Sequence, residues 1–72
     1  MIEAMVLIFG KDTCPYTRAA RDHYSGRHVE VDYRNVKKDP ASLAEMLQLT
    51  NGRRDVPVIV DAGKITIGFG GT

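Results

Sequence analysis

The sequence predicts an α/β domain in which strands and helices follow the order βαβαββ and form a four-stranded mixed sheet. Three observations support this fold class: an apolar run near the start, two helix starts marked by proline, and a final pair of short β-rich runs around a tight turn. Helices between strands favour parallel pairing, whereas the last two runs can pair antiparallel. With 72 residues, the chain is long enough for a single domain, residues 1–72, and too short for a second core.

Four segments have the composition of strands. The first, residues 5–9, is continuously apolar, which is typical of a central strand buried on both faces. In residues 29–34 apolar and charged side chains alternate, which predicts a strand with one wet face near a sheet edge. Two short strands are predicted at residues 58–60 and 64–67, joined as a hairpin by residues 61–63.

Both helices are predicted to begin at a proline that follows a polar cap. Pro15 opens the first helix, with Thr13 or Cys14 as its cap, and Asp39 caps the second helix before Pro40. The helix ends are marked by Ser25 with Gly26 and by Asn51 with Gly52. The side chains expected to face the core are Ala19, Ala20, Tyr24, Leu43, Met46, Leu47 and Thr50.

Composition excludes several classes of function. The formal net charge is +1, so the chain has no charge excess of the kind that binds nucleic acid. The apolar run near the start is too short for a membrane span and lacks a basic leader, so neither a signal peptide nor a membrane interaction is expected. A single cysteine excludes an internal disulfide and suits a reducing compartment, which predicts a cytoplasmic location.

Cys14 is the candidate reactive residue. It lies at a helix N-terminus just beyond the carboxyl end of a central strand, where open α/β sheets place their ligands. Unpaired backbone N–H groups and the helix dipole favour a thiolate there. Lys11 and Arg18 add positive charge, and Asp12 opposes them. We therefore expect a reactive, exposed thiol with a lowered pKa.

Three segments resemble glutaredoxins. Residues 11–17 read Lys-Asp-Thr-Cys-Pro-Tyr-Thr, similar to the family's active site, Lys-x-x-Cys-Pro-Tyr-Cys. Residues 50–57 resemble the family segment that ends in Thr-Val-Pro, and residues 67–70 resemble its Gly-Gly turn. The resemblance implies a thioredoxin-like fold of glutaredoxin type. It also implies thiol–disulfide oxidoreductase activity with glutathione as co-substrate and disulfide-containing proteins as partners.

The resemblance also implies roles for individual residues. Cys14 would be the nucleophile, Val56 would pair its backbone with glutathione, and Pro57 would be cis. Arg53 or Arg54 would hold the glycyl carboxylate of glutathione. The implied glutathione contacts are Lys11, Tyr16, Thr17, Arg54, Val56, Pro57 and Gly68.

The sequence departs from the family pattern at three places. Thr17 replaces the second cysteine, so the chain is monothiol, and the Thr17 hydroxyl can donate to the Cys14 thiolate or can simply lie on the helix surface. Phe69 replaces the second glycine of the turn, as in the Ser-Gly-Phe turn of dithiol redoxins reduced by thioredoxin reductase. The family's last helix is missing after Thr72, which predicts a thinly covered sheet face and a monomer or weak homodimer.

Two other functions are compatible with these residues. In one, Cys14 from two subunits and two glutathiones ligate a [2Fe–2S] cluster, although Pro15 disfavours this role. In the other, the domain is a binding module that turns over poorly, and the low-molecular-weight thiol need not be glutathione. No resident metal is expected, because His23 and His28 have no clustered ligands around them.

Overall fold

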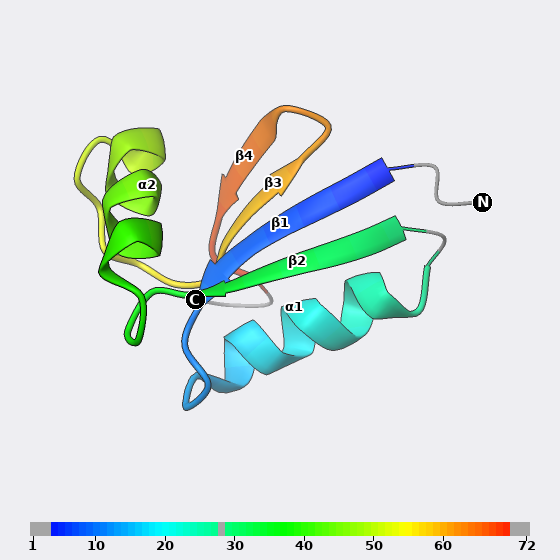
Figure 1. Cartoon of the computed structure of the whole chain (residues 1–72). Helices are drawn as coiled ribbons and strands as arrows, with labels where there is room; N and C mark the ends of the chain where they lie inside the picture. The colour runs from blue at the N-terminus through cyan, green and yellow to red at the C-terminus, as the bar shows by residue number, and fades with distance from the viewer. Residues whose placement is uncertain (1–3, 28, 70–72) are drawn as a thin grey trace.

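The computed structural model describes residues 4–27 and 29–69 (Figure 1). The elements are β1 (Ala4–Gly10), α1 (Pro15–Ser25), β2 (Val29–Asn35), α2 (Pro40–Thr50), β3 (Val58–Asp61) and β4 (Lys64–Ile67). The sheet order is β2-β1-β3-β4, with β1 parallel to β2 and antiparallel to β3, and β3 antiparallel to β4. The predicted α/β class, element order and four-stranded mixed sheet are confirmed.

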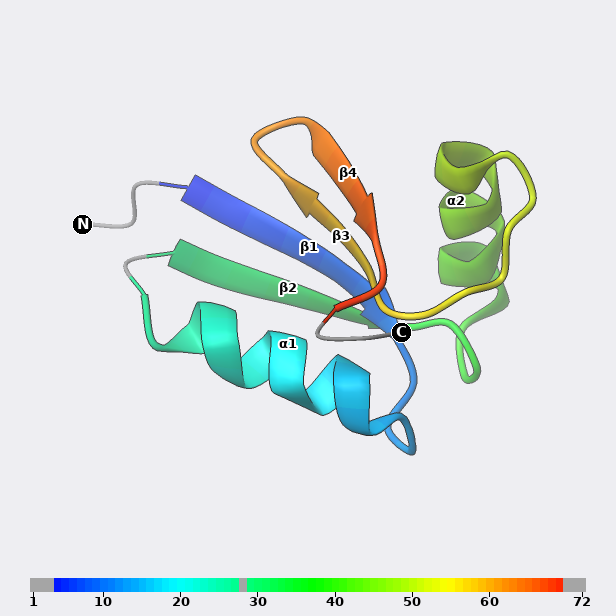
Figure 2. The same cartoon turned by 180° about the vertical axis from the view of Figure 1, so that it is seen from behind.

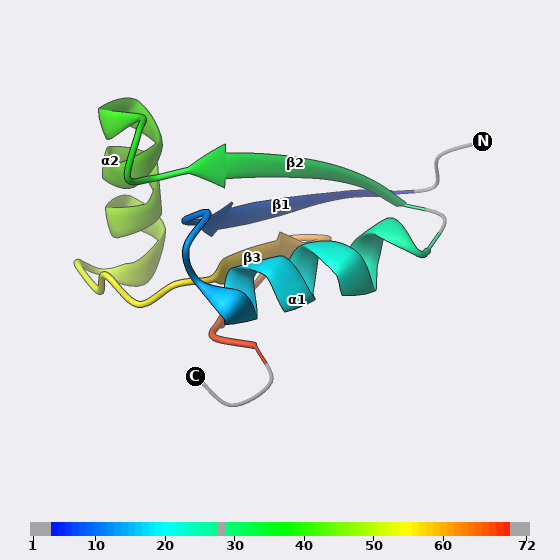
Figure 3. The ribbon, with the colours of Figure 1, turned by 90° about the horizontal axis from the view of Figure 1, so that it is seen from below.

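The central strand β1 divides the core into two layers because its side chains alternate between the faces of the sheet. Val6 and Ile8 pack with Ala20 of α1, whereas Phe9 packs with Met46 of α2. Figures 2 and 3 show α1 running along the strands, while α2 lies beyond the carboxyl ends of β1 and β2. Because α2 covers only that end, Met5 at the start of β1 is 55% exposed, and the prediction that residues 5–9 are all buried is wrong for Met5.

Helix α1 packs through a stripe that differs from the predicted one. Thr17 and Ala20 are buried and Tyr24 is half-buried, whereas Ala19 is exposed. Positions 17, 20 and 24 follow the spacing of one helical face, and position 19 falls outside it. The predicted inward role of Ala19 is therefore wrong, and the buried position belongs to Thr17.

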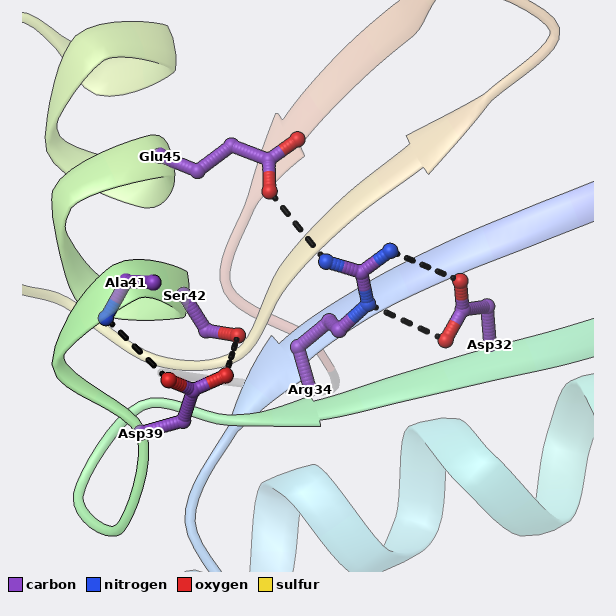
Figure 4. Close-up of polar contacts among 6 residues, drawn as sticks. All are labelled: Asp32, Arg34, Asp39, Ala41, Ser42 and Glu45. Carbon is purple, nitrogen blue, oxygen red and sulfur yellow. Dashed lines mark hydrogen bonds and ion pairs between the residues drawn. The ribbon is translucent and has the colours of Figure 1, made fainter.

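Helix α2 begins with a complete side-chain cap. The Asp39 carboxylate accepts hydrogen bonds from the Ala41 backbone N–H, at 3.1 Å, and from the Ser42 hydroxyl, at 2.8 Å (Figure 4). Pro40 follows as the first helical residue, where a missing N–H costs nothing. These bonds hold the pKa of Asp39 below its ordinary value, the Ser42 hydroxyl being the largest influence.

Strand β2 is an outer strand, as the alternating pattern predicted. Arg34 of β2 bridges two carboxylates, Asp32 at 3.1 Å and Glu45 of α2 at 3.3 Å (Figure 4). All three side chains are partly exposed, so this bridge contributes little to the stability of the fold.

The final hairpin turns more tightly than the sequence indicated. Asp61 pairs with Lys64 in the strand ladder, so that the turn consists of Ala62 and Gly63 rather than residues 61–63. Both turn residues have positive φ, 53° and 83°, which suits the twist of a two-residue hairpin. In the described part of the chain, neither helix is long and apolar enough to cross a membrane.

Candidate active site

Cys14 is the N-cap residue of α1, at the carboxyl end of β1. Its backbone is extended, with φ −91° and ψ 116°, and Pro15 is the first helical residue. The Cys14 N–H donates to the Lys11 carbonyl, and the Cys14 carbonyl accepts from the Arg18 N–H, both at 3.2 Å. These two bonds fix the turn, while the thiol itself forms no capping hydrogen bond.

The Cys14 thiol is less accessible than its sequence context predicts. The residue is 9% exposed, so the prediction of an exposed thiol is wrong. An N-cap side chain folds back over the first turn of its helix, toward backbone N–H groups that have no helical partner. For Cys14 these groups belong to Tyr16 and Thr17, and the same placement that buries the sulfur also surrounds it with donors.

The pKa of the Cys14 thiol is nevertheless lowered, as predicted. Burial is the largest single influence and raises the pKa. The Thr17 hydroxyl, the N–H groups of Thr17 and Tyr16, and the charge of Lys11 together outweigh burial. The site therefore stabilises a thiolate, the form that attacks disulfides.

Thr17 is buried beneath the thiol rather than on the helix surface. It is 1% exposed, and its Oγ1 makes no hydrogen bond of ordinary geometry with the described residues. The Thr17 hydroxyl is nevertheless among the groups that lower the pKa of the Cys14 thiol, after the opposing effect of burial. Gly10 makes this position possible, because a Cβ at Gly10 would overlap Cγ2 and Oγ1 of Thr17.

The negative charge of Asp12 is compensated by residues distant in sequence. The Tyr33 hydroxyl donates to Asp12 Oδ1 at 2.8 Å, and Lys38 Nζ lies 3.5 Å from Oδ2. The Tyr33 hydrogen bond, followed by the charge of Lys38, holds the pKa of Asp12 below its ordinary value. Burial and then Asp12 raise the pKa of Tyr33 to about 12. Sequence reasoning missed Tyr33 and Lys38, because no local motif connects them to Cys14.

A second segment, residues 53–57, reaches the same end of the sheet. Figures 1 and 3 show it running from α2 to the start of β3, beside the turn that leads into α1. The Val56–Pro57 peptide bond is cis, as predicted. Neither the N–H nor the C=O of Val56 is hydrogen-bonded to any residue that the structure describes. The Gly68 N–H, by contrast, already donates to the Pro57 carbonyl at 2.7 Å.

The two adjacent arginines of this segment differ in availability. Arg53 Nε donates to Asp55 at 2.9 Å, and the Arg53 carbonyl accepts from the Thr50 hydroxyl at 2.7 Å. Arg54 is exposed and has no ion-pair partner within residues 4–27 and 29–69. Of the two alternatives that the sequence left open, Arg54 is thus the guanidinium that is free to take a carboxylate.

Comparison with protein-family models gives a match to Glutaredoxin over residues 6–65. The chain belongs to the glutaredoxin family. The matched range includes both the Cys14 turn and the cis-proline segment of this family member, so it confirms the resemblance seen in the sequence. A search of curated proteins finds no match.

Two solved structures share the fold of this glutaredoxin-family chain. One is the glutaredoxin of Archaeoglobus fulgidus, 24% identical, with a TM-score of 0.74 over 94% of this chain and 78% of the other. The other is the glutaredoxin-like NrdH-redoxin of Escherichia coli, described as having a thioredoxin-like activity profile. It is also 24% identical, with a TM-score of 0.74 over 92% of this chain and 84% of the other. The thioredoxin-like fold is thereby shown.

The remaining candidate positions surround this centre or lie apart from it. Lys11 and Tyr16 are exposed on either side of Cys14. His23 lies farther along α1, with its ring 4.9 Å from that of Tyr24 and 5.4 Å from that of Phe69. His28 and the residues after Phe69 lie outside the described residues. Among the residues described, no group of three or more His, Cys, Asp and Glu side chains could hold a metal ion.

Proposed function

We propose that this glutaredoxin-family protein reduces glutathione mixed disulfides by a monothiol route with Cys14 as the nucleophile. The observation that carries the proposal is the position of Cys14 as the N-cap of α1 at the carboxyl end of β1, a placement that lowers the pKa of its thiol. Val56, whose backbone groups have no partner in the described chain, supports it. A thiolate and an open stretch of backbone are what an extended thiol peptide requires.

The reaction proceeds by two thiol–disulfide exchanges. The Cys14 thiolate attacks the glutathionyl sulfur of a mixed disulfide, a Cys14–glutathione disulfide forms, and the substrate leaves as a thiolate that takes a proton from solvent. A second glutathione thiolate then attacks the glutathionyl sulfur. Glutathione disulfide forms, and Cys14 returns to the thiolate. One free glutathione is consumed, and the disulfide passes from the substrate to glutathione disulfide, so no second cysteine is required.

Glutathione contacts follow from groups that are not already occupied. The N–H and C=O of Val56 would pair with the cysteinyl residue of glutathione, beside Pro57. Arg54 would hold a carboxylate through a forked hydrogen bond, with Lys11 and Tyr16 beside the sulfur. Gly68 would let glutathione approach the backbone closely, because it has no side chain. Its N–H would not bind glutathione, since it already donates to the Pro57 carbonyl.

Thr17 serves this site as a donor to the nucleophile. Its buried hydroxyl has no other partner of ordinary geometry in the described chain, and donation to the thiolate stabilises that form. A hydroxyl cannot resolve a mixed disulfide, so every disulfide of Cys14 must be resolved by an external thiol. This requirement favours a reducing cytoplasm and disulfide-containing proteins as partners.

The test is turnover of a glutathionylated peptide with glutathione as reductant. We expect wild-type turnover and none above background for Cys14→Ser. Arg54→Gln should raise the KM for the glutathionylated substrate about tenfold, the effect of losing one charge-assisted bond. Arg53→Gln is the matched control and should change the KM less, because Asp55 already occupies Arg53.

Three results would contradict the proposal. Turnover unchanged by Cys14→Ser would show that Cys14 is not the nucleophile. Reduction of the protein by a thioredoxin reductase but not by glutathione would show that glutathione is not the reductant. Aerobically purified protein that is brown and is bleached by a chelator would favour the cluster-carrier alternative.

A further inference from the structure

A groove between α1 and β2 lies outside the proposed glutathione contacts. Its cavity volume is about 350 Å³, and its lining residues are Arg18, Arg21, Asp22, Ser25, Val31 and Tyr33. None of the proposed contacts Arg54, Val56 and Pro57 lines it. Figures 1 and 2 show α1 running alongside β2, the outer strand of the sheet, so the groove follows an edge to which an extended segment has access.

The groove presents two guanidinium groups, and the charge of Arg21, after the Tyr33 hydrogen bond and Lys38, helps to lower the pKa of Asp12 at its active-site end. The Arg21 guanidinium lies 4.0 Å from the centroid of the Tyr33 ring. In the part of the chain that the structure describes, neither Arg18 nor Arg21 forms an ion pair. A guanidinium stacked on a ring keeps the N–H donors of its edge free for a carboxylate. Asp22 contributes one negative charge to the lining, which leaves the lining with a net charge of +1.

The tyrosine beneath Arg21 is itself fixed at the active-site end. Its hydroxyl donates to Asp12, two residues before Cys14, at 2.8 Å. Arg18 lies at the same end, since its N–H donates to the Cys14 carbonyl. The groove therefore begins within one helical turn of the nucleophile and extends away from it along α1.

The helix sets the distance between the nucleophile and each guanidinium. At 1.5 Å rise per residue, the backbone positions of Arg18 and Arg21 lie about 6 and 10 Å along the axis from Cys14. An extended peptide advances about 3.3 Å per residue. A segment whose cysteine meets Cys14 would bring a carboxylate to these guanidinium groups from two or three residues away.

We propose that the groove between α1 and β2 docks an extended, acidic segment of a protein partner. A carboxylate two or three residues from the target cysteine binds Arg21, with Arg18 beside it. The site selects protein substrates independently of the glutathione contacts. Only the position of the target cysteine rests on the proposed function.

The test is binding of a labelled peptide whose target cysteine is replaced by serine, measured by fluorescence anisotropy with the Cys14→Ser chain. One peptide carries Glu at the second and third positions from the serine, and a matched peptide carries Gln there. At low ionic strength we expect the Glu peptide to bind about tenfold more tightly than the Gln peptide. Salt should reduce this advantage, because the groove is open to solvent.

The Arg21→Gln variant should reduce the Glu-to-Gln affinity ratio to near one. Arg27→Gln, an exposed arginine just beyond α1 and outside the groove, should leave the ratio unchanged. Because each variant is compared with itself on two peptides, a general loss of stability cannot imitate the result. Equal binding of the two peptides, or a ratio that survives Arg21→Gln, overturns the proposal. Both peptides lack a thiol, so a redox-inactive protein can still pass this test and a redox-active one can fail it.

Discussion

The two helices of this small domain begin with the same arrangement and use it differently. Each has an extended N-cap residue, proline at the next position and a buried hydroxyl at the third helical position: Cys14, Pro15 and Thr17 in α1, and Asp39, Pro40 and Ser42 in α2. In α2 the carboxylate closes the cap with two hydrogen bonds, whereas in α1 the thiol forms no capping bond. A closed cap stabilises a helix. An open one leaves donors that can stabilise an attacking thiolate.

The largest expected effect comes from giving α1 the cap residue of α2. Cys14→Asp should lower disulfide-exchange turnover at least about a thousandfold, since loss of a nucleophile removes the reaction itself. The same variant should be more stable than wild type by about 1 kcal/mol, because the carboxylate can accept the N–H groups that the thiol leaves unbonded. Turnover of a glutathionylated peptide and urea unfolding measure the two effects.

The control for this exchange is a thiol placed at the other cap. Cys14→Ser combined with Asp39→Cys puts the thiol at the start of α2 instead of α1 and should remain inactive. Turnover within tenfold of wild type would show that a thiol at any helix N-terminus creates the activity. It would contradict the conclusion that the surroundings of the α1 cap are required.

Gly10 distinguishes the two caps sterically, because it leaves space for Thr17. Gly10→Ala should destabilise the protein by about 1–3 kcal/mol, as overpacked cores do, since the new methyl group overlaps Thr17. It should also alter the pH dependence of Cys14 alkylation. Gly26→Ala is the matched control: the nearest atoms to its Cβ would be 3.8 and 3.9 Å away, so thermal and urea unfolding should change little. Equal stability of the two variants would contradict the steric role of Gly10.

Removing the hydroxyl at the third position should act in opposite ways in the two helices. Thr17→Val keeps the side-chain volume and removes a donor to the thiolate, so the pKa of Cys14 should rise and alkylation at neutral pH should slow several-fold. At a pH where the thiol is protonated, stability should change little, because the Thr17 hydroxyl makes no hydrogen bond there that its loss would break. Ser42→Ala should lower stability and leave alkylation unchanged. If Thr17→Val leaves the alkylation profile at its wild-type position, Thr17 does not assist the nucleophile.

The smallest effect concerns the pH dependence of the α2 cap. The pKa of Asp39 is lowered by folding, so its contribution to stability is present above the unfolded value of about 3.9 and is lost as the pH falls through the folded value. Asp39→Asn should therefore melt a few degrees below wild type at pH 7, and the two melting temperatures should converge in acid below about pH 4. A difference that persists at pH 2 would assign the effect to something other than the Asp39 charge.

Local sequence patterns account for most of the features of the fold that the sequence predicted. Strand and helix periods and the proline at each helix start each involve a few neighbouring residues, so they predicted the element order and the reactive cysteine. The cis proline was implied by the resemblance of residues 50–57 to the glutaredoxin segment. The errors at Met5 and Cys14 occurred where burial depends on neighbours from elsewhere, because the surrounding elements determine which atoms reach solvent. Ala19 was assigned to the wrong face of its helix, and the last turn was predicted one residue too long.

The sequence by itself thus determined the fold class and the presence of a single cysteine, which has no internal disulfide partner. Tertiary structure alone decided that Thr17 lies buried against Gly10 and that Tyr33 supports Arg21. The parallel register of β1 and β2 places Tyr33 opposite Ile8, near the turn that carries Asp12. Contacts between residues so distant in sequence exist only once the strands are paired, because pairing, and no local propensity, sets the distance between them.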